Sequence, residues 1–215
     1  MPADSSEAPF RAFVEETIAS SGSANHDFVG LLAGSGPVSR PTMADTLHHL
    51  SLLHGNRPSV FEVVAQSALV PAPEWLNAAM RAFAGERDLM SRLMVAAGPP
   101  PSRLGQTSVQ ETVSGTRTAL LTLAGSDRLG CAIGAAAALL LDWDGVSEAL
   151  AGIAQRLGAD AGRRHQAWPS PAETMRMAET AAALPGGERA VRFGFQTLLA
   201  QHRAFWNIVQ SRATA

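Results

Sequence analysis

The chain has one cysteine, no tyrosine and few other aromatic residues, and each shortage excludes a class of structure or site. Cys131 has no second cysteine to pair with, which excludes an intrachain disulfide and a cysteine-based zinc site. The lack of tyrosine removes that side chain from any catalytic role. Aromatic residues total 6%, which disfavours a β-sandwich because strands are rich in aromatic and β-branched residues. Cys131 itself lies in an apolar run, where we expect a buried, unreactive thiol.

Charged residues are also scarce, and the two signs nearly balance. They make up 17% of the chain, against ~25% in typical domains, and the formal net charge is -2. Nucleic-acid binding needs clustered lysines and arginines that displace counterions from phosphates. The densest basic stretch is residues 163–165, Arg-Arg-His, which is too short to make such a surface. The sequence therefore predicts no nucleic-acid partner.

No segment has the pattern of a secretory signal or a membrane span. Residues 1–7 are polar and acidic, without the basic and apolar regions of a signal peptide. The longest apolar run, residues 129–141, reaches only about 20 Å as a helix, short of the ~30 Å hydrocarbon core of a bilayer. We therefore expect a cytoplasmic protein with no membrane partner, in which this run forms a buried central helix.

The length and the apolar content predict one folded domain. The chain has 215 residues, within the roughly 200–250 that single domains reach. Hydrophobic residues make up 46% of it, which argues against disorder. The sequence contains no internal repeat and no linker, so residues 1–215 are expected to form a single domain.

Signals for helix starts and stops recur along the chain. Residues 59–62 and 170–173 have the Ser-x-x-Glu spacing of capping boxes, which satisfy backbone amides that the first helical turn leaves free. Residues 107–110 make a third box, Thr-x-x-Gln, and residues 42–45 a weaker fourth. Glycine and proline mark the stops, at Gly55, residues 98–101 and residues 185–187.

These signals predict an all-α fold, a multi-helix bundle without a sheet. No segment keeps the alternation of apolar and polar residues that a strand requires. The triplet Asp142-Trp143-Asp144 is interpreted as the end of one helix and the cap of the next. About nine helices are expected, over residues 8–20, 42–54, 59–69, 73–97, 107–124, 127–141, 144–157, 170–184 and 188–211, with a short turn near 26–32.

Small residues recur on one face of the helix expected over residues 127–141. Gly130, Gly134 and Ala138 are four residues apart, so their side chains share that face. A helical glycine costs about 1 kcal/mol relative to alanine, and close packing against another helix would offset this cost. We therefore expect Gly134→Leu to overpack the core and Gly134→Ala to be milder.

The same region carries a resemblance to a known family. Its residues are 98–102 (GPPPS), 123–136 (LAGSDRLGCAIGAA) and 141–143 (LDW), within a stretch of about a fifth of the chain, residues 98–144. The pattern resembles an uncharacterised family of bacterial hypothetical proteins, a domain of unknown function. The resemblance implies a bacterial cytosolic protein, and it transfers no activity, cofactor or catalytic residue.

Common metal and phosphate motifs are absent from the sequence. No glutamate is followed by histidine three residues later, as carboxylate-bridged di-iron bundles require, and there is no His-Glu-x-x-His. His48 and His49 are adjacent, so they diverge by about 100° on a helix and are poorly placed to share a metal. The chain has neither a phosphate-binding loop nor a Gly-x-Ser-x-Gly elbow. We therefore predict no metal, no cofactor and no motif-based catalytic residue.

Three polar residues fall where helical periodicity expects apolar ones. His54, Arg87 and His202 each lie on the apolar face of a different predicted helix. The structural interpretation is a core histidine bonded to a carbonyl, and an arginine that reaches water or pairs with a carboxylate. The functional interpretation is a shared pocket between helices, in which Arg87 binds an anion and a histidine acts as a hydrogen-bonding or acid–base group.

Three classes of function stay open from the sequence. The leading one is a non-catalytic helical protein that binds a protein partner or a small apolar or anionic ligand in a pocket between helices. The first alternative is an enzyme without a recognisable motif that uses His54 or His202 with Arg87. The second is a structural homodimer built on an apolar helix face.

Overall fold

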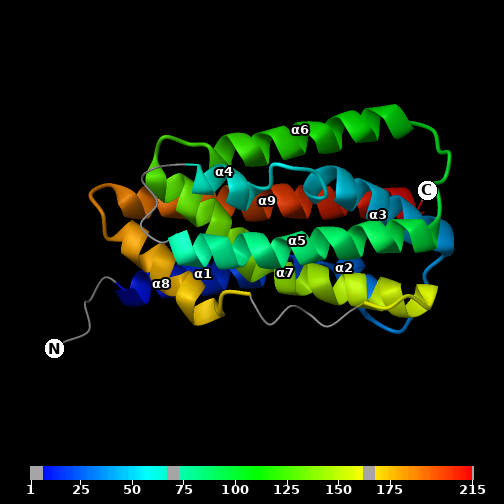
Figure 1. Cartoon of the computed structure of the whole chain (residues 1–215), viewed down its shortest axis with the longest axis horizontal. Coiled ribbons are helices and arrows are strands. Elements are labelled where there is room, and N and C mark those ends of the chain that lie inside the picture. Colours follow the sequence, from blue (N-terminus) through cyan, green and yellow to red (C-terminus); the bar gives the residue numbers. More distant parts are fainter. Residues whose placement is uncertain (1–6, 67–72, 162–167, 215) are drawn as a thin grey trace.

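The computed structural model describes residues 7–66, 73–161 and 168–214, and every regular element in these ranges is helical. This confirms the all-α prediction (Figure 1). The basic stretch 163–165 lies outside the described residues. The elements are α1 (Glu7–Ser21), the short 3-10 helix η1 (Ser23–Asn25), α2 (Asp27–Ala33), α3 (Arg40–His54), α4 (Val60–Ala65), α5 (Pro73–Ala97), α6 (Gln106–Ala124), α7 (Leu129–Leu157), α8 (Pro171–Ala182) and α9 (Gly187–Thr214).

The two strong capping boxes, which begin at Ser59 and Ser170, are confirmed, whereas the third box and the weaker fourth one are wrong. Ser59 caps α4 and Ser170 caps α8, each with both hydrogen bonds of the box. α3 instead begins at Arg40 with Ser39 as its cap, because a proline at position 41 extends the first turn in front of residue 42. α6 begins at residue 106, behind Gly105, which has a φ of 74° and no side-chain cap. The predicted end of the α4 helix at residue 69 falls outside the described residues.

The largest error concerns the central helix, which is one element and not two. α7 runs unbroken through Asp142-Trp143-Asp144, where the sequence pattern indicates a helix end. The Asp142 carboxylate caps no helix, because it accepts hydrogen bonds from the backbone N–H and the hydroxyl of Ser23 instead. Contacts from a distant segment thus satisfy a carboxylate that would otherwise disfavour a buried mid-helix position.

Because α7 is continuous, it is longer than the predicted apolar helix and reaches the length of a membrane span. In the described part of the chain, residues 130–157 form one helix that is long and apolar enough to cross a bilayer by length and composition. Of its most apolar window, 83% is buried inside the fold, and central helices of soluble bundles pass the same test. The prediction of a buried central helix is confirmed, whereas its predicted end at residue 141 is wrong.

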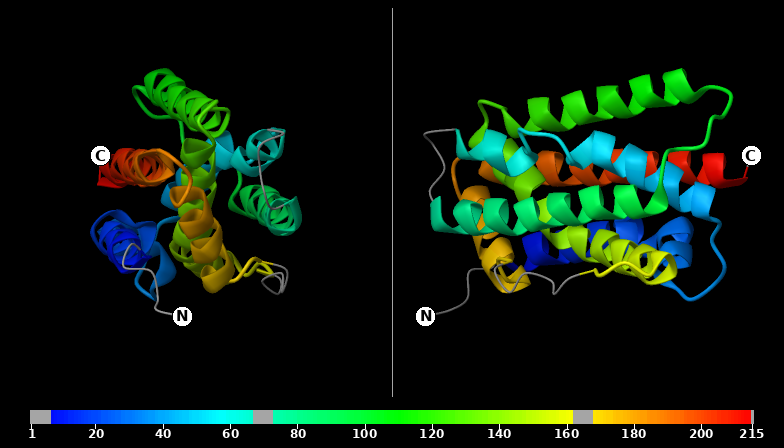
Figure 2. Two further views of the ribbon diagram at one scale, coloured as in Figure 1. Left: turned by 90° about the vertical axis from the view of Figure 1, so that its left-hand side faces the viewer. Right: turned by 45° about the vertical axis from the view of Figure 1, so that its right-hand side comes forward.

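The other helices surround α7. It packs against α9, α2, α8, α5, α6 and η1, and two views of the ribbon place it inside the bundle (Figure 2). α9 makes the most extensive contact with α7 and α5 crosses it, while α6 lies at one edge of the molecule, over α3, α4 and α9 (Figures 1 and 2). Most of the α6 side chains are exposed. The side of α6 that packs on the bundle buries Val113, Leu120, Leu123 and Ala124.

The predicted small-residue face of α7 is where α9 approaches most closely. A Cβ atom built on Gly134 would lie 2.2 Å from the carbonyl oxygen of Val191 in α9. The reverse contact is equally tight, since a Cβ on Gly194 would lie 2.1 Å from the carbonyl oxygen of Cys131. Backbone therefore meets backbone here, and Cys131 is a buried free thiol. The prediction of close packing at Gly134 is confirmed.

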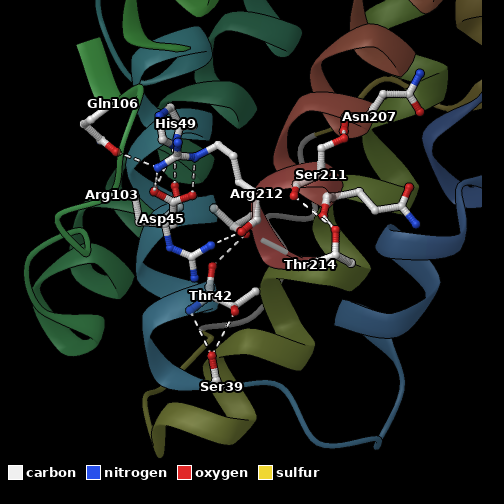
Figure 3. Close-up of polar contacts among 12 residues, drawn as sticks. Ser39, Thr42, Asp45, His49, Arg103, Gln106, Asn207, Ser211, Arg212 and Thr214 are labelled. Atoms are coloured by element: carbon white, nitrogen blue, oxygen red, sulfur yellow. Dashed lines mark hydrogen bonds and ion pairs between the residues drawn. The ribbon is translucent and has the colours of Figure 1, made fainter. Parts of the chain in front are cut away.

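A buried ion cluster holds the C-terminal end of α9 against α3 (Figure 3). Both Arg212 nitrogens, Nε and Nη2, lie 2.7 Å from the carboxylate oxygens of Asp45, and Arg212 also donates to the side-chain oxygen of Gln106 at 2.5 Å. The hydrogen bonds to Asp45 raise the pKa of Arg212. His49 Nδ1 lies 2.8 Å from the Asp45 carbonyl oxygen, and Arg103 donates to the carbonyl of Arg212. α9 therefore continues to residue 214, beyond its predicted end at 211.

Candidate functional site

The structure brings two of the three predicted site residues into direct contact. His54 is the last residue of α3, and His202 lies in the middle of α9. Their Nε2 atoms are 3.0 Å apart, and the two residues are 4% and 2% exposed. The rings of Phe83 and Trp143 meet the edge or face of the His54 ring at centroid distances of 5.9 Å and 5.2 Å. We call His54 and His202 the histidine pair.

A chain of hydrogen bonds continues from His202 into the centre of α7. His202 Nδ1 lies 2.7 Å from Asp142 Oδ2. The backbone N–H of Ser23 donates to Asp142 Oδ1 and its hydroxyl to Oδ2, both at 2.6 Å. The Ser23 oxygen in turn accepts a hydrogen bond from Trp206 Nε1 at 2.9 Å. Three donors thus surround the buried carboxylate, which explains how it is tolerated inside the core.

The geometry of the histidine pair keeps His54 uncharged. Only one hydrogen fits between two nitrogens 3.0 Å apart, so one Nε2 donates and the other accepts. His202 Nδ1 donates to the Asp142 carboxylate, which orients the His202 ring. Burial lowers the pKa of His54 well below 6.5, and the nearby charge of His202 lowers it further.

This arrangement predicts loss of stability as the pH falls. The pKa of His54 is lower in the folded protein than in the unfolded chain, so below about 6.5 the unfolded chain binds more protons. Stability is therefore full above that pH and declines below it, by up to about 1.4 kcal/mol per pH unit for each such group. Burial also lowers the pKa of His49, so the wild type should show both contributions.

His54→Gln should remove one of the two contributions. The glutamine side chain keeps a polar group beside His202 but does not titrate. Urea unfolding measured from pH 7.5 to pH 5 should give a shallower decline for this variant, and His49→Gln should remove the other share. A decline as steep in His54→Gln as in the wild type would contradict the assignment.

The third predicted residue, Arg87, has a different partner. Its Nη1 lies 3.4 Å from Glu62 Oε2, on the neighbouring helix α4. Glu62 also pairs with Arg57 at 3.2 Å and serves in the Ser59 capping box. The Arg87 guanidinium lies 5.8 Å from the centroid of the Phe83 ring, which His54 also contacts. Arg87 is therefore linked to His54 only through this ring, and it faces an internal carboxylate.

A second group of buried polar atoms belongs to side chains at or near the same phenylalanine, and these atoms have no hydrogen-bond partner in the part of the chain that the structure describes. Four of the five buried side-chain polar atoms that lack a hydrogen bond in the described residues belong to Glu86, Trp143, Ser147 and Trp168. Phe83 contacts Trp143 at a centroid distance of 4.7 Å and Trp168 at 6.4 Å. We call these four residues, together with the Phe83 ring, the polar core cluster.

Helix geometry places the remaining two members of the polar core cluster beside this contact. Glu86 follows Phe83 by three residues on α5, so the two side chains share a face. Ser147 follows Trp143 by four residues on α7, with the same result. The two faces meet where the Phe83 and Trp143 rings pack. The unpartnered atoms are Glu86 Oε2, Trp143 Nε1, Ser147 Oγ and Trp168 Nε1.

The polar core cluster has little signal in the sequence. Glu86 stands beside Arg87 and belongs to no capping box and no metal-binding spacing. Trp143 carries a signal, since a buried indole needs an acceptor, but its position between two aspartates favours a helix end instead. Asp142 has a stronger signal, because it interrupts a long apolar run. Ser23 has none, since nothing near it in the sequence indicates a partner more than a hundred residues away.

The described part of the chain contains no group of three or more histidine, cysteine, aspartate or glutamate residues arranged to hold a metal ion. A surface hollow of about 1120 Å³ lies beside the start of α9 and includes Arg128, Cys131 and Phe193. It contains none of the three predicted site residues.

Comparison with known proteins identifies the family and nothing more specific. No curated protein and no solved structure matches the chain. A model described as a family of unknown function, DUF6975, matches residues 18–215, far more than the stretch that carries the resemblance in the sequence. The expectation of an uncharacterised domain is thus confirmed, and a bacterial source stays a prediction. The chain belongs to the family of unknown function DUF6975.

Proposed function

We propose that this protein is a non-catalytic binding protein that encloses a small polar molecule at the polar core cluster, between α5, α7 and Trp168. One observation carries the proposal. Four buried polar atoms from three separate segments belong to side chains at or beside the contacts of one phenylalanine ring, and within the described residues none of the four has a hydrogen-bond partner. In folded proteins most buried polar atoms are satisfied by protein groups or by bound water.

The energetics favour an occupant. A buried donor or acceptor without a partner costs about 1–3 kcal/mol, so several such atoms in one place are a substantial burden for a single domain. A molecule that both donates and accepts hydrogen bonds relieves this cost. Pockets between the helices of bundles are a common place for such ligands.

The alternative of a catalytic histidine has less support from the geometry. A general acid or base must reach the proton that it transfers, directly or through one water. The Nε2 atoms of the histidine pair face each other, and His202 Nδ1 is bonded to Asp142. Arg87, the proposed anion-binding group of that alternative, faces Glu62. A cytoplasmic location and the absence of nucleic-acid and membrane partners stay predictions, as does a homodimer.

The four tryptophans provide a direct test with internal controls. Trp75 Nε1 donates to Thr174 and Trp206 Nε1 to Ser23, whereas the indole N–H groups of Trp143 and Trp168 have no partner among the described residues. An indole ¹H–¹⁵N spectrum should give four signals, which Trp→Phe variants assign. Titration with a library of small polar metabolites should move the Trp143 and Trp168 signals and leave the other two in place.

The outcome is decisive in both directions. Selective movement of the two unpartnered signals by at least one compound supports the proposal. If no compound in the library moves them, or if all four signals always move together, the polar core cluster holds only ordered water and the proposed function is wrong.

A further inference from the structure

The hydrogen-bonding groups of the polar core cluster also define what its ligand must offer. Trp143 and Trp168 each present an N–H, which is a donor only. Glu86 Oε2 is an acceptor when the carboxyl group is ionised, and the Ser147 hydroxyl serves either way. A molecule that satisfies all four atoms therefore carries at least one donor group and one oxygen acceptor.

The carboxylate of Glu86 narrows the range of ligands that fit the polar core cluster. Glu86 is only 5% exposed, and among the described residues it forms no ion pair. The adjacent arginine, Arg87, is engaged with Glu62 on α4. A buried carboxylate without a counter-charge is expensive, so a cationic donor matches Oε2 better than a neutral one.

The aromatic rings of the polar core cluster also favour a cationic group on the ligand. The Phe83 ring packs edge to face against both Trp143 and Trp168, with interplanar angles of 67° and 86°. Aromatic faces attract cations through their quadrupole, and tryptophan does so most strongly. A carboxylate on the same helix face as Phe83 is thus suited to an ammonium group, while the two indole N–H groups suit an oxygen atom.

We propose that the ligand of the polar core cluster is a small ammonium compound that also carries a hydroxyl or carbonyl oxygen. The ammonium group lies against Glu86 and the aromatic rings, and the oxygen accepts from Trp143 and Trp168. This inference rests on the proposed function and specifies the chemical class of its ligand. Trp168 is the partly exposed member of the cluster, so it is the side from which the ligand enters.

Two probes of nearly equal size separate the charge from the shape. Ethanolamine and ethylene glycol differ in one group, an ammonium in place of a hydroxyl. Titrated into the full-length protein and followed by the Trp143 and Trp168 indole signals, ethanolamine should bind at least tenfold more tightly than ethylene glycol. Glycolate, an anion of the same size, should bind more weakly than either.

Glu86→Gln supplies the matched variant, because it keeps the shape and removes the charge. The variant should lose the preference for ethanolamine and still bind ethylene glycol about as well as the wild type does. The Trp75 and Trp206 signals report whether Glu86→Gln is folded. If Glu86→Gln does not fold, Trp143→Phe is the second variant, and it removes one indole donor. Trp143→Phe should weaken the binding of both ethanolamine and ethylene glycol, as followed by the Trp168 signal.

Each contrary result has its own meaning. Equal binding of the two probes, or a preference for ethanolamine that survives in Glu86→Gln, overturns the ammonium assignment while the proposed binding function stands. Failure of both probes to move the two signals also overturns it, and the metabolite library then decides separately whether the cluster binds any ligand or ordered water only.

Discussion

Gly134→Ala is expected to destabilise the protein by roughly 3 kcal/mol or more, at the upper end of the usual cost of overpacking. The added Cβ would meet the carbonyl oxygen of Val191 at 2.2 Å, and the next contacts, at 2.9 Å and 3.0 Å, are also backbone atoms of that residue. Because backbone cannot rotate away as a side chain can, α7 and α9 have to move apart. Urea unfolding should show a lower midpoint, and Gly134→Leu should fail to fold.

Gly115→Ala is the matched control for this prediction. Gly115 also lies inside a helix, α6, but a Cβ there would meet nothing within 4 Å. Alanine has the better helix propensity, so this variant should gain up to about 1 kcal/mol. Unchanged stability in Gly134→Ala, measured alongside this control, would mean that the two helices do not touch at residue 134.

Arg212→Met should cost about 3–5 kcal/mol, because it leaves the Asp45 carboxylate buried without its counter-charge. Asp45 and Arg212 are 3% and 7% exposed, and the two hydrogen bonds between them are both 2.7 Å long. The pair holds α9 to α3, so the loss should appear as a lower unfolding midpoint in urea and in heat.

Arg11→Met is the control for an exposed ion pair. The Arg11 side chain is 52% exposed and lies 2.7 Å from Glu179, and such pairs contribute about 0–1 kcal/mol. The double variant of Asp45→Leu with Arg212→Met should recover part of the loss, since it removes both charges together. A single Arg212→Met variant no less stable than Arg11→Met would show that the buried pair contributes nothing.

Arg87→Met should lower the free energy of unfolding less than Arg212→Met does, because Glu62, the partner of Arg87, has other groups that stabilise its charge. The Glu62 carboxylate retains Arg57 and the hydrogen bond from the Ser59 backbone N–H when Arg87 is lost. The Glu62 side chain is also 20% exposed, so water stabilises part of its charge.

The amino-acid sequence predicts those features that depend on neighbours along the chain. A capping box forms from residues three positions apart, and both strong boxes are at the predicted positions. The all-α class, the buried faces and the small-residue face at Gly134 follow from periodicities of three to four residues. The placement of His54 and His202 in the core follows in the same way.

Only the tertiary structure decided the pairings between distant residues. Asp142 looks like a helix cap in the sequence, yet it is buried within α7 because Ser23 and His202 satisfy it. His54 meets His202 while Arg87 meets Glu62, and nothing in the sequence distinguishes these partners.

The physical reason is the difference between local and long-range terms. Helix formation depends on bonds between residues four apart, which the sequence displays directly. The partner of a buried polar atom depends instead on how whole helices rotate and pack, which many weak contacts determine together. The polar core cluster is the extreme case, because its atoms come from separate segments, and only the packed helices show that these atoms lack partners among the residues that the structure describes.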